Sequence, residues 1–246
     1  MNDDDKQHNA AKLLEQLQRS QAFHQDGIIG IEEGFSRLRR WQSARLARTH
    51  ADLLHHPRYQ AAAIFFLEEL YGDRDFLRRE RDLTRIAPMM SRILPAGALH
   101  SAALALELNA LSYELDAAMT RILLASGHLH DAQLDEAAYI AAYRCCAGYE
   151  FRRHQIDLVE QLGQDLEKIV RKPLIRTALK VAKTPARLAG VGELHRFLEA
   201  GFHAFRQMGT DARTFVATIT RRERIILEQI GAGQAHPLEL PIKTVS

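Results

Sequence analysis

Residues that favour helices dominate this chain, and no segment alternates apolar and polar side chains for long enough to form a β-strand. Among its 246 residues are 35 Ala and 33 Leu but only 6 Val, and Glu, Gln and Arg are also frequent. Ala, Leu, Glu, Gln and Arg lose little side-chain freedom in a helix. The sequence therefore predicts an all-α fold, as a single compact multi-helix bundle-like domain of about ten helices.

Glycine, proline and capping residues set the expected helix boundaries. The expected helices cover residues 9–24, 31–54, 57–72, 76–93, 98–125, 132–147, 149–170, 193–208 and 211–230, with a short helix between Pro173 and Pro185. Pro88 lies inside one of them, so we expect a kink or a stop there. Short connections favour antiparallel neighbours in one domain, while a division into two domains near residues 173–192 stays open.

The two ends of the chain lack helical periodicity. Residues 1–8 are acidic and carry no apolar stretch, so we expect a disordered N-terminus that is neither a secretory signal nor a transit peptide. Residues 231–246 contain Gly231, Gly233, Pro237 and Pro241, which predict a flexible C-terminal tail. The helical domain is therefore expected to span residues 9–230.

Composition excludes several classes of protein. An apolar fraction of 46% excludes intrinsic disorder, and a net charge of +2 gives no general attraction to nucleic acid. The longest unbroken apolar runs, 61–67 and 137–143, are far shorter than the roughly 20 residues of a transmembrane helix. The only cysteines, Cys145 and Cys146, are adjacent, which predicts no disulfide framework and a cytoplasmic protein.

Catalytic and cofactor signatures are absent from the sequence. There is no GxGxxG, GxxxxGK[ST], GxSxG or HExxH motif, and no DNA-binding motif spacing. We therefore expect no cofactor, and catalytic residues stay unknown. This absence favours a non-enzymatic protein and does not indicate nucleic acid as a partner.

A largely apolar segment runs from Tyr59 to Gly72, with Glu68 and Glu69 near its end. Its apolar residues lie all round the expected helix, which predicts a place at the centre of the core. The string FFLEELY, from Phe65 to Tyr71, closely resembles the signature of the bacterial FFLEELY motif proteins. Residues 72–76, 88–95 and 108–116 are similar too, so the resemblance is plausible over roughly residues 55–120. It implies a bacterial, helical protein and implies no chemistry.

Two interpretations of this segment stay open. The motif can be purely architectural, with its acids paired to nearby arginines. Alternatively, its acidic and phenolic side chains line a polar pocket at the end of the helix; these are Glu68, Glu69, Tyr71, Asp73 and Asp75.

The helix expected over residues 98–125 carries a polar stripe beside an apolar one. Leu104, Leu108, Leu111, Leu115 and Met119 share one face, and Asn109, Ser112, Tyr113 and Asp116 lie about 110° away. If the helix is central, the polar stripe is buried and needs partners. It then forms a structural hydrogen-bond network or a ligand pocket; otherwise the helix lies at the surface.

Histidine pairs invite a metal interpretation that the spacing does not support. Glu150 and His154 share a helix face, as do His195, Glu199 and His203. Both sets lie mostly on the face predicted to be wet, and His195 and His203 are about 12 Å apart at the usual helical rise. We therefore expect surface pairing and no metal site.

The strongest electrostatic signal is an acid-free basic segment, residues 171–187. On a helix its basic residues Arg176, Lys180 and Lys183 cluster, with Arg187 at the end, opposite Leu174, Ala178, Val181 and Ala182. Such a face can be simply solvated, or it can meet phosphates, anionic lipid or an acidic protein. The first functional hypothesis is therefore a non-enzymatic interaction or regulatory protein that binds an unknown protein or anionic partner here. The alternative is a small-ligand-binding protein or enzyme with a polar pocket between helices, and a homo-oligomer interface stays open.

Overall fold

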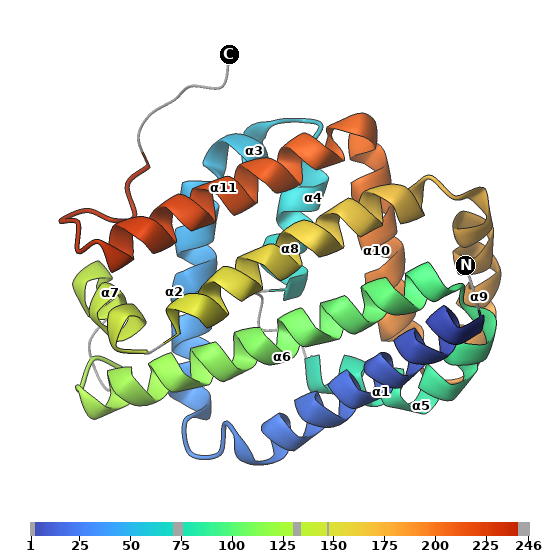
Figure 1. The fold of residues 1–246 in the computed structure, drawn as a ribbon, viewed down its shortest axis with the longest axis horizontal. Coiled ribbons are helices and arrows are strands. Elements are labelled where there is room, and N and C mark those ends of the chain that lie inside the picture. Colours follow the sequence, from blue (N-terminus) through green and yellow to red (C-terminus); the bar gives the residue numbers. More distant parts are fainter. Residues whose placement is uncertain (1–2, 71–75, 130–133, 147, 241–246) are drawn as a thin grey trace.

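The structure is a computed structural model that describes residues 3–70, 76–129, 134–146 and 148–240, and these residues form helices without β-strands (Figure 1). The helices are α1 (Asp3–Asp26), α2 (Glu32–Thr49), α3 (Ala51–His55), α4 (Gln60–Phe65), the π-helical turn η1 (Phe66–Leu70), α5 (Phe76–Ile93), α6 (Ala96–Ala125), α7 (Glu136–Cys145), α8 (Tyr149–Val170), α9 (Pro173–Leu188), α10 (Gly192–Met208), the 3-10 turn η2 (Gly209–Asp211) and α11 (Ala212–Gly231). The all-α prediction is confirmed.

Helix α6 lies at the centre of this arrangement. In Figure 1, α1, α6, α8 and α11 form one layer of neighbouring helices, and α2, α4 and α10 cross behind it. The predicted apolar stripe of α6 is buried, and its leucines pack against Leu158 of α8. The interior between the two layers therefore receives side chains from both, and the polar stripe of α6 is close to it.

Residues 3–8, which were expected to be disordered, are helical in the structure. Helix α1 begins at Asp3, and Lys6 Nζ donates a hydrogen bond to the carbonyl of Arg92 at 2.7 Å. Asn9 Nδ2 donates to the carbonyl of Ala96 at 3.1 Å, so the helix start is held by the connection between α5 and α6. Leu13 and Leu17 then bury α1 against α6.

Residues 238–240 of the expected flexible tail contact the helices. Leu238 and Leu240 pack against the buried cluster that contains Ile226 and Ile230. Gln229 Nε2 also donates to the carbonyl of Glu239 at 3.3 Å. The segment folds back because its apolar side chains Leu238 and Leu240 are buried in part, although they follow no helical period. Residues 241–246 lie outside the described residues.

The FFLEELY segment does not occupy the centre of the core. Its α-helix ends at Phe65 and continues as the π-helical turn η1. Ile64 is 39% exposed and Glu68 is exposed, because this helix covers one side of α10. Phe65 contacts Phe197 of α10, and Phe66 contacts Phe205 and Phe215.

Prolines interrupt the helices less than expected. Helix α5 continues through Pro88, so the predicted stop is absent, and α9 runs from Pro173 through Pro185 to Leu188. Conversely, the helix expected over 31–54 divides into α2 and α3 at His50. None of the helices in the described ranges combines the length and apolarity that crossing a bilayer requires.

Candidate functional site

A cavity of about 240 Å³ lies between the two layers. Its wall is built by side chains of α2, α6, α8, α10 and α11, with contributions from α3, α4, η1, α5 and α7. The lining residues of α6 run from Ala102 to Asp116, which is about 21 Å at the usual helical rise. The cavity is therefore elongated along α6.

One end of the cavity is apolar. Its lining is formed by residues from α5, the first half of α6, the second half of α8 and α10: Leu83, Met90, Ala102, Ala105, Leu106, Val159, Leu162, Leu194, Phe197 and Leu198. Ala105 and Leu198 are also exposed, so this end reaches the surface between α6 and α10.

The other end is polar and carries buried charges. Its lining comes from α2, the second half of α6, α7, α8 and α11: Arg39, Gln42, Arg45, Asn109, Ser112, Tyr113, Asp116, Tyr143, Arg152, Gln155 and Glu223. Three guanidinium groups and two carboxylates are among these residues, so this end has an excess of one positive charge when both acids are ionised.

Asp116 and Arg152 form the inner part of the polar end. Both are buried, at 4% and 6% exposure, and Arg152 Nη1 is 3.8 Å from Asp116 Oδ1. Gln42 Nε2 donates to the same Asp116 oxygen at 3.0 Å. Burial raises the pKa of Asp116, and the guanidinium groups of Arg152 and Arg39 counter that rise only in part.

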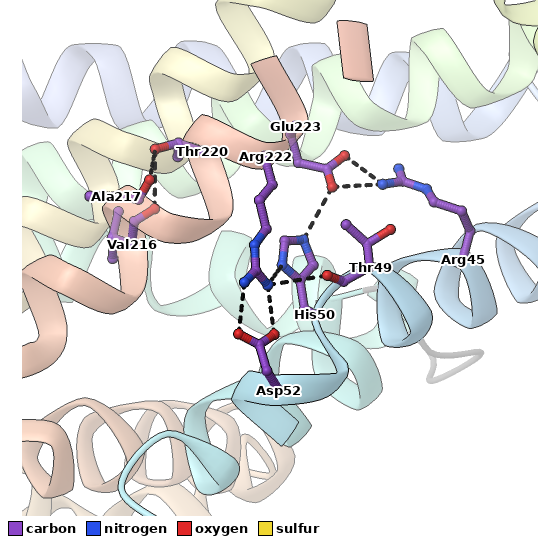
Figure 2. Close-up of polar contacts among 9 residues, drawn as sticks. All are labelled: Arg45, Thr49, His50, Asp52, Val216, Ala217, Thr220, Arg222 and Glu223. Carbon is purple, nitrogen blue, oxygen red and sulfur yellow. Dashed lines mark hydrogen bonds and ion pairs between the residues drawn. The ribbon is translucent and has the colours of Figure 1, made fainter. Parts of the chain in front are cut away.

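A second cluster joins α2 and α11 (Figure 2). Arg45 Nη1 donates to both oxygens of Glu223, at 2.6 and 2.7 Å. Burial disfavours the charge on Glu223, but Arg45 and a hydrogen bond from His50 outweigh it and hold its pKa at about 2. Arg222 binds Asp52 through two hydrogen bonds of 2.7 Å, which closes the cluster on the outer side.

His50 has a defined tautomer in this cluster. Its Nδ1 is 3.5 Å from Arg222 Nη1, and an arginine side chain can only donate. Nδ1 is therefore the acceptor, and Nε2 carries the proton that it donates to Glu223 at 3.1 Å. The cluster thus holds Glu223 in one orientation at the wall of the cavity.

Several buried polar atoms of the lining have no hydrogen-bond partner in the described part of the chain. These are Gln42 Oε1, Arg45 Nε and Asn109 Nδ2. Unpaired buried polar atoms are rare in folded proteins, and each one needs an explanation such as water or a ligand.

The structure brings only part of the predicted pocket together. Of the pocket candidates, Asn109, Tyr113 and Asp116 line the cavity, and Tyr113 is buried beneath Arg39, whose guanidinium carbon is 4.7 Å from the ring centre. Glu68 is exposed and does not line it; Phe66 and Leu67 of the motif do. Tyr71, Asp73 and Asp75 lie outside the described residues, as does the side chain of Glu69.

Sequence reasoning missed the charged residues contributed by the other helices. A signal was present, because each of them interrupts an apolar stripe at helical spacing. Arg152 precedes Ile156 and Val159 on α8, and Glu223 lies between Thr220 and Leu227 on α11. Gln42 and Arg45 likewise follow Leu38 and precede Leu46 on α2.

The basic residues predicted to meet a partner lie on helix α9 and are not part of the cavity lining. Arg176, Lys180, Lys183 and Arg187 are all exposed. Most of the apolar face expected on this helix is exposed: Leu174 and Val181 are 74% and 70% exposed, and Ala178 is exposed too, while Ala182 is partly buried. Leu188 is also 80% exposed. The other partly buried residues are Ile175, Leu179 and Ala186, so α9 contacts the protein through a third face.

Helix α9 also covers His195 and buries it. It was expected on a wet face but is 6% exposed, with Nε2 donating to the carbonyl of Leu179 at 2.7 Å. His154, by contrast, is exposed and pairs with Glu107 at 3.0 Å. Within the described ranges, no group of three or more His, Cys, Asp or Glu side chains could hold a metal ion.

Comparison with known proteins identifies a family for this chain. The model of the family described as Domain of unknown function (DUF8198) matches residues 7–237. Comparison with curated proteins and with solved structures gives no match. The resemblance to the FFLEELY motif proteins stays a prediction, and the chemistry of the site rests on its own residues.

Proposed function

The chain belongs to the family described as Domain of unknown function (DUF8198), and we propose that it binds a small amphipathic organic molecule between its two helix layers. The observation that carries this proposal is the cavity itself, apolar at its open end and charged at its inner end. The polar stripe of α6 supports it, since Asn109, Tyr113 and Asp116 all face this space.

The volume of the cavity sets the size of the molecule. Its 240 Å³ exceeds the roughly 150 Å³ of an engineered cavity that holds benzene. It is below the roughly 300 Å³ at the lower limit of drug-sized ligand pockets. A ligand of about ten non-hydrogen atoms, such as a short aliphatic chain with one polar end, is therefore the right size.

A purely structural hydrogen-bond network explains the site less well. Such a network pairs its members, whereas Gln42 Oε1, Arg45 Nε and Asn109 Nδ2 have no partner within the described residues. Water can satisfy these atoms, but water gains little from the apolar end, where polar partners are absent among the described lining residues. An amphipathic molecule suits both ends.

The lining residues favour binding over nucleophilic catalysis. The aliphatic hydroxyl groups in the described lining are those of Ser112 and Thr220. Both donate to backbone carbonyls four residues earlier, at 2.7 and 3.1 Å. Neither hydroxyl is therefore aimed at a general base.

Native mass spectrometry of protein purified without added ligand tests the proposal. We expect a retained organic mass, or binding of added n-octanol or octanoate that raises the melting temperature. Ala105→Phe narrows the open end and should abolish that effect, while Ala125→Phe, at an exposed position of the same helix outside the lining, should preserve it. Equal probe binding by both variants contradicts binding in the cavity.

A second candidate function is docking of α9 on an anionic lipid surface. The specific observation is that this helix exposes two neighbouring rows of side chains, one aliphatic and one basic, with Thr177 and Thr184 between them. The aliphatic row is Leu174, Val181 and Leu188, and the basic row is Arg176, Lys180, Lys183 and Arg187. An amphipathic helix that lies in a membrane surface uses this combination of aliphatic insertion and attraction to anionic headgroups. We also propose a cytoplasmic location, supported by the free thiols of Cys145 and Cys146.

Vesicle sedimentation tests this second candidate. The protein should sediment with vesicles that contain phosphatidylserine and stay in solution with pure phosphatidylcholine. Triple reversal to Glu at Arg176, Lys180 and Lys183 should abolish sedimentation. The same reversal at three exposed arginines elsewhere should have less effect; these are Arg40, Arg153 and Arg221. Unchanged sedimentation of the α9 variant rules out this surface.

A further inference from the structure

The buried charges at the polar end of the cavity are not equally paired. Arg45 and Glu223 form a complete pair, with two hydrogen bonds of 2.6 and 2.7 Å between them. Arg152 has no such partner, because its closest carboxylate oxygen, on Asp116, is 3.8 Å away. That distance is beyond hydrogen-bonding range.

The donors of Arg152 are instead directed at weak or neutral acceptors. Nη2 donates to the thioether sulfur of Met119 at 2.9 Å, and Nη1 donates to the amide oxygen of Gln155 at 3.2 Å. The guanidinium carbon lies 4.8 Å from the centre of the Tyr143 ring. A guanidinium group is thus buried at 6% exposure against a sulfur atom, an amide and an aromatic face.

Asp116 compensates for this only in part. Its Oδ1 accepts from Gln42, and burial raises its pKa, so its ionised form is disfavoured. Arg39 adds a further positive charge beside it, stacked on Tyr113. A buried cation without a hydrogen-bonded anion is costly, and a ligand anion in the adjoining cavity removes that cost.

We propose that the polar end receives the carboxylate of a short aliphatic acid, held by the guanidinium group of Arg152. This inference rests on the proposed function and names its ligand class. The described lining residues carry an excess of positive charge, and a carboxylate matches the planar donors of a guanidinium group. Arg45 Nε supplies a further unpaired donor at this end, and the aliphatic chain follows α6 toward Ala102.

The geometry gives the remaining unpaired atoms different roles. Asn109 lies two helical turns before Asp116, toward the apolar end, where the aliphatic chain of the ligand offers no acceptor, so its amide donor needs a water molecule. Gln42 Oε1 is an acceptor and cannot bind a carboxylate, so it needs a donor other than the ligand.

Calorimetric titration with three probes of equal chain length tests the proposal: octanoate, n-octanol and octylamine. We expect octanoate to bind about 10-fold to 100-fold more tightly than n-octanol, as for a hydrogen bond to a charged group. Octylamine should bind most weakly. Arg152→Gln should remove the preference for octanoate over n-octanol. The neighbouring Arg153→Gln, at an exposed side chain, should leave that preference unchanged.

Because Arg152 is buried, a second variant guards against loss of folding. Arg152→Gln combined with Asp116→Asn removes both charges and leaves neutral amides in their place. Equal binding of octanoate and n-octanol by the wild-type protein overturns the carboxylate inference and leaves the proposed function standing. Undiminished octanoate binding by the folded double variant, or tighter binding of octylamine than of octanoate, also overturns it. Failure of all three probes to bind removes the proposed function and this inference together.

Discussion

The ion pair between Arg45 and Glu223 predicts how the stability of this protein depends on pH. Glu223→Gln keeps the size of the side chain and an acceptor for His50 but removes the negative charge that faces Arg45. The pKa of Glu223 is about 2 in the folded protein, compared with 4.5 for an unperturbed glutamate. Its depressed folded-state pKa means that ionised Glu223 stabilises the fold.

This difference between the folded-state and unperturbed pKa of Glu223 corresponds to a stabilisation of the fold by about 3 kcal/mol at neutral pH. The contribution is fully present above about pH 4.5 and is lost as the pH falls toward the folded-state value. At pH 3 only about 1.4 kcal/mol remains. Glu223→Gln should therefore destabilise the protein by about 3 kcal/mol at pH 7, in line with the roughly 3–5 kcal/mol for breaking a buried pair. For a chain of this length that lowers the melting temperature by roughly 10 °C.

Urea denaturation followed by circular dichroism measures the free energy of unfolding at pH 7 and at pH 3. We expect a loss of stability for Glu223→Gln that is roughly two to two and a half times larger at pH 7 than at pH 3. The matched control is Glu228→Gln, an exposed glutamate on the same helix, which should change stability by less than about 0.5 kcal/mol. A deficit of equal size at both pH values, or wild-type stability at pH 7, refutes the reasoning.

Three further predictions follow from the packing and the burial. Burial raises the pKa of Asp116, so the protonated side chain stabilises the fold. This stabilisation is fully present below the usual aspartate pKa of 3.8 and is lost as the pH rises through the folded-state pKa. Asp116→Asn should abolish that loss of stability in denaturation experiments from pH 4 to pH 8. A Cβ at Gly163 would lie 2.5 and 2.7 Å from the methyl groups of Val216, so Gly163→Ala should cost about 1–3 kcal/mol and Val216→Ala should restore part of it in the double variant. Leu13 is 1% exposed and Leu14 is 43% exposed, so Leu13→Ala should lower the free energy of unfolding by about 2–5 kcal/mol and Leu14→Ala by much less, whereas equal effects would contradict the docking of α1.

Periodicity and punctuation predicted most of the helices. The boundaries of α5 and α8 agree with the expected 76–93 and 149–170, because glycine and proline stand at or near their ends. The polar stripe of α6 also predicted three residues of the cavity. These features depend on neighbouring residues in the sequence, which is why the sequence alone contains them.

What the sequence did not contain is the identity of the surface that covers each helix face. Arg152 and Glu223 belong to polar-looking stretches, and only packing against α6 and α2 makes them part of a cavity wall. His195 is buried because α9 folds over α10, which no local pattern in α10 indicates. Residues 3–8 are helical because Lys6 and Asn9 reach carbonyls more than 80 residues away.

The order of the two cavity ends has a consequence for kinetics. The open end, at Ala105 and Leu198, is apolar, and the charged end is closed by α2, α8 and α11. An anionic molecule that leaves must carry its charge past apolar side chains, where it lacks solvation. Release is then slower than the affinity alone implies, unless α10 moves away from α6. Under the proposed function, the protein would keep a bound ligand through dilution, and the residence time would depend on the packing of α10.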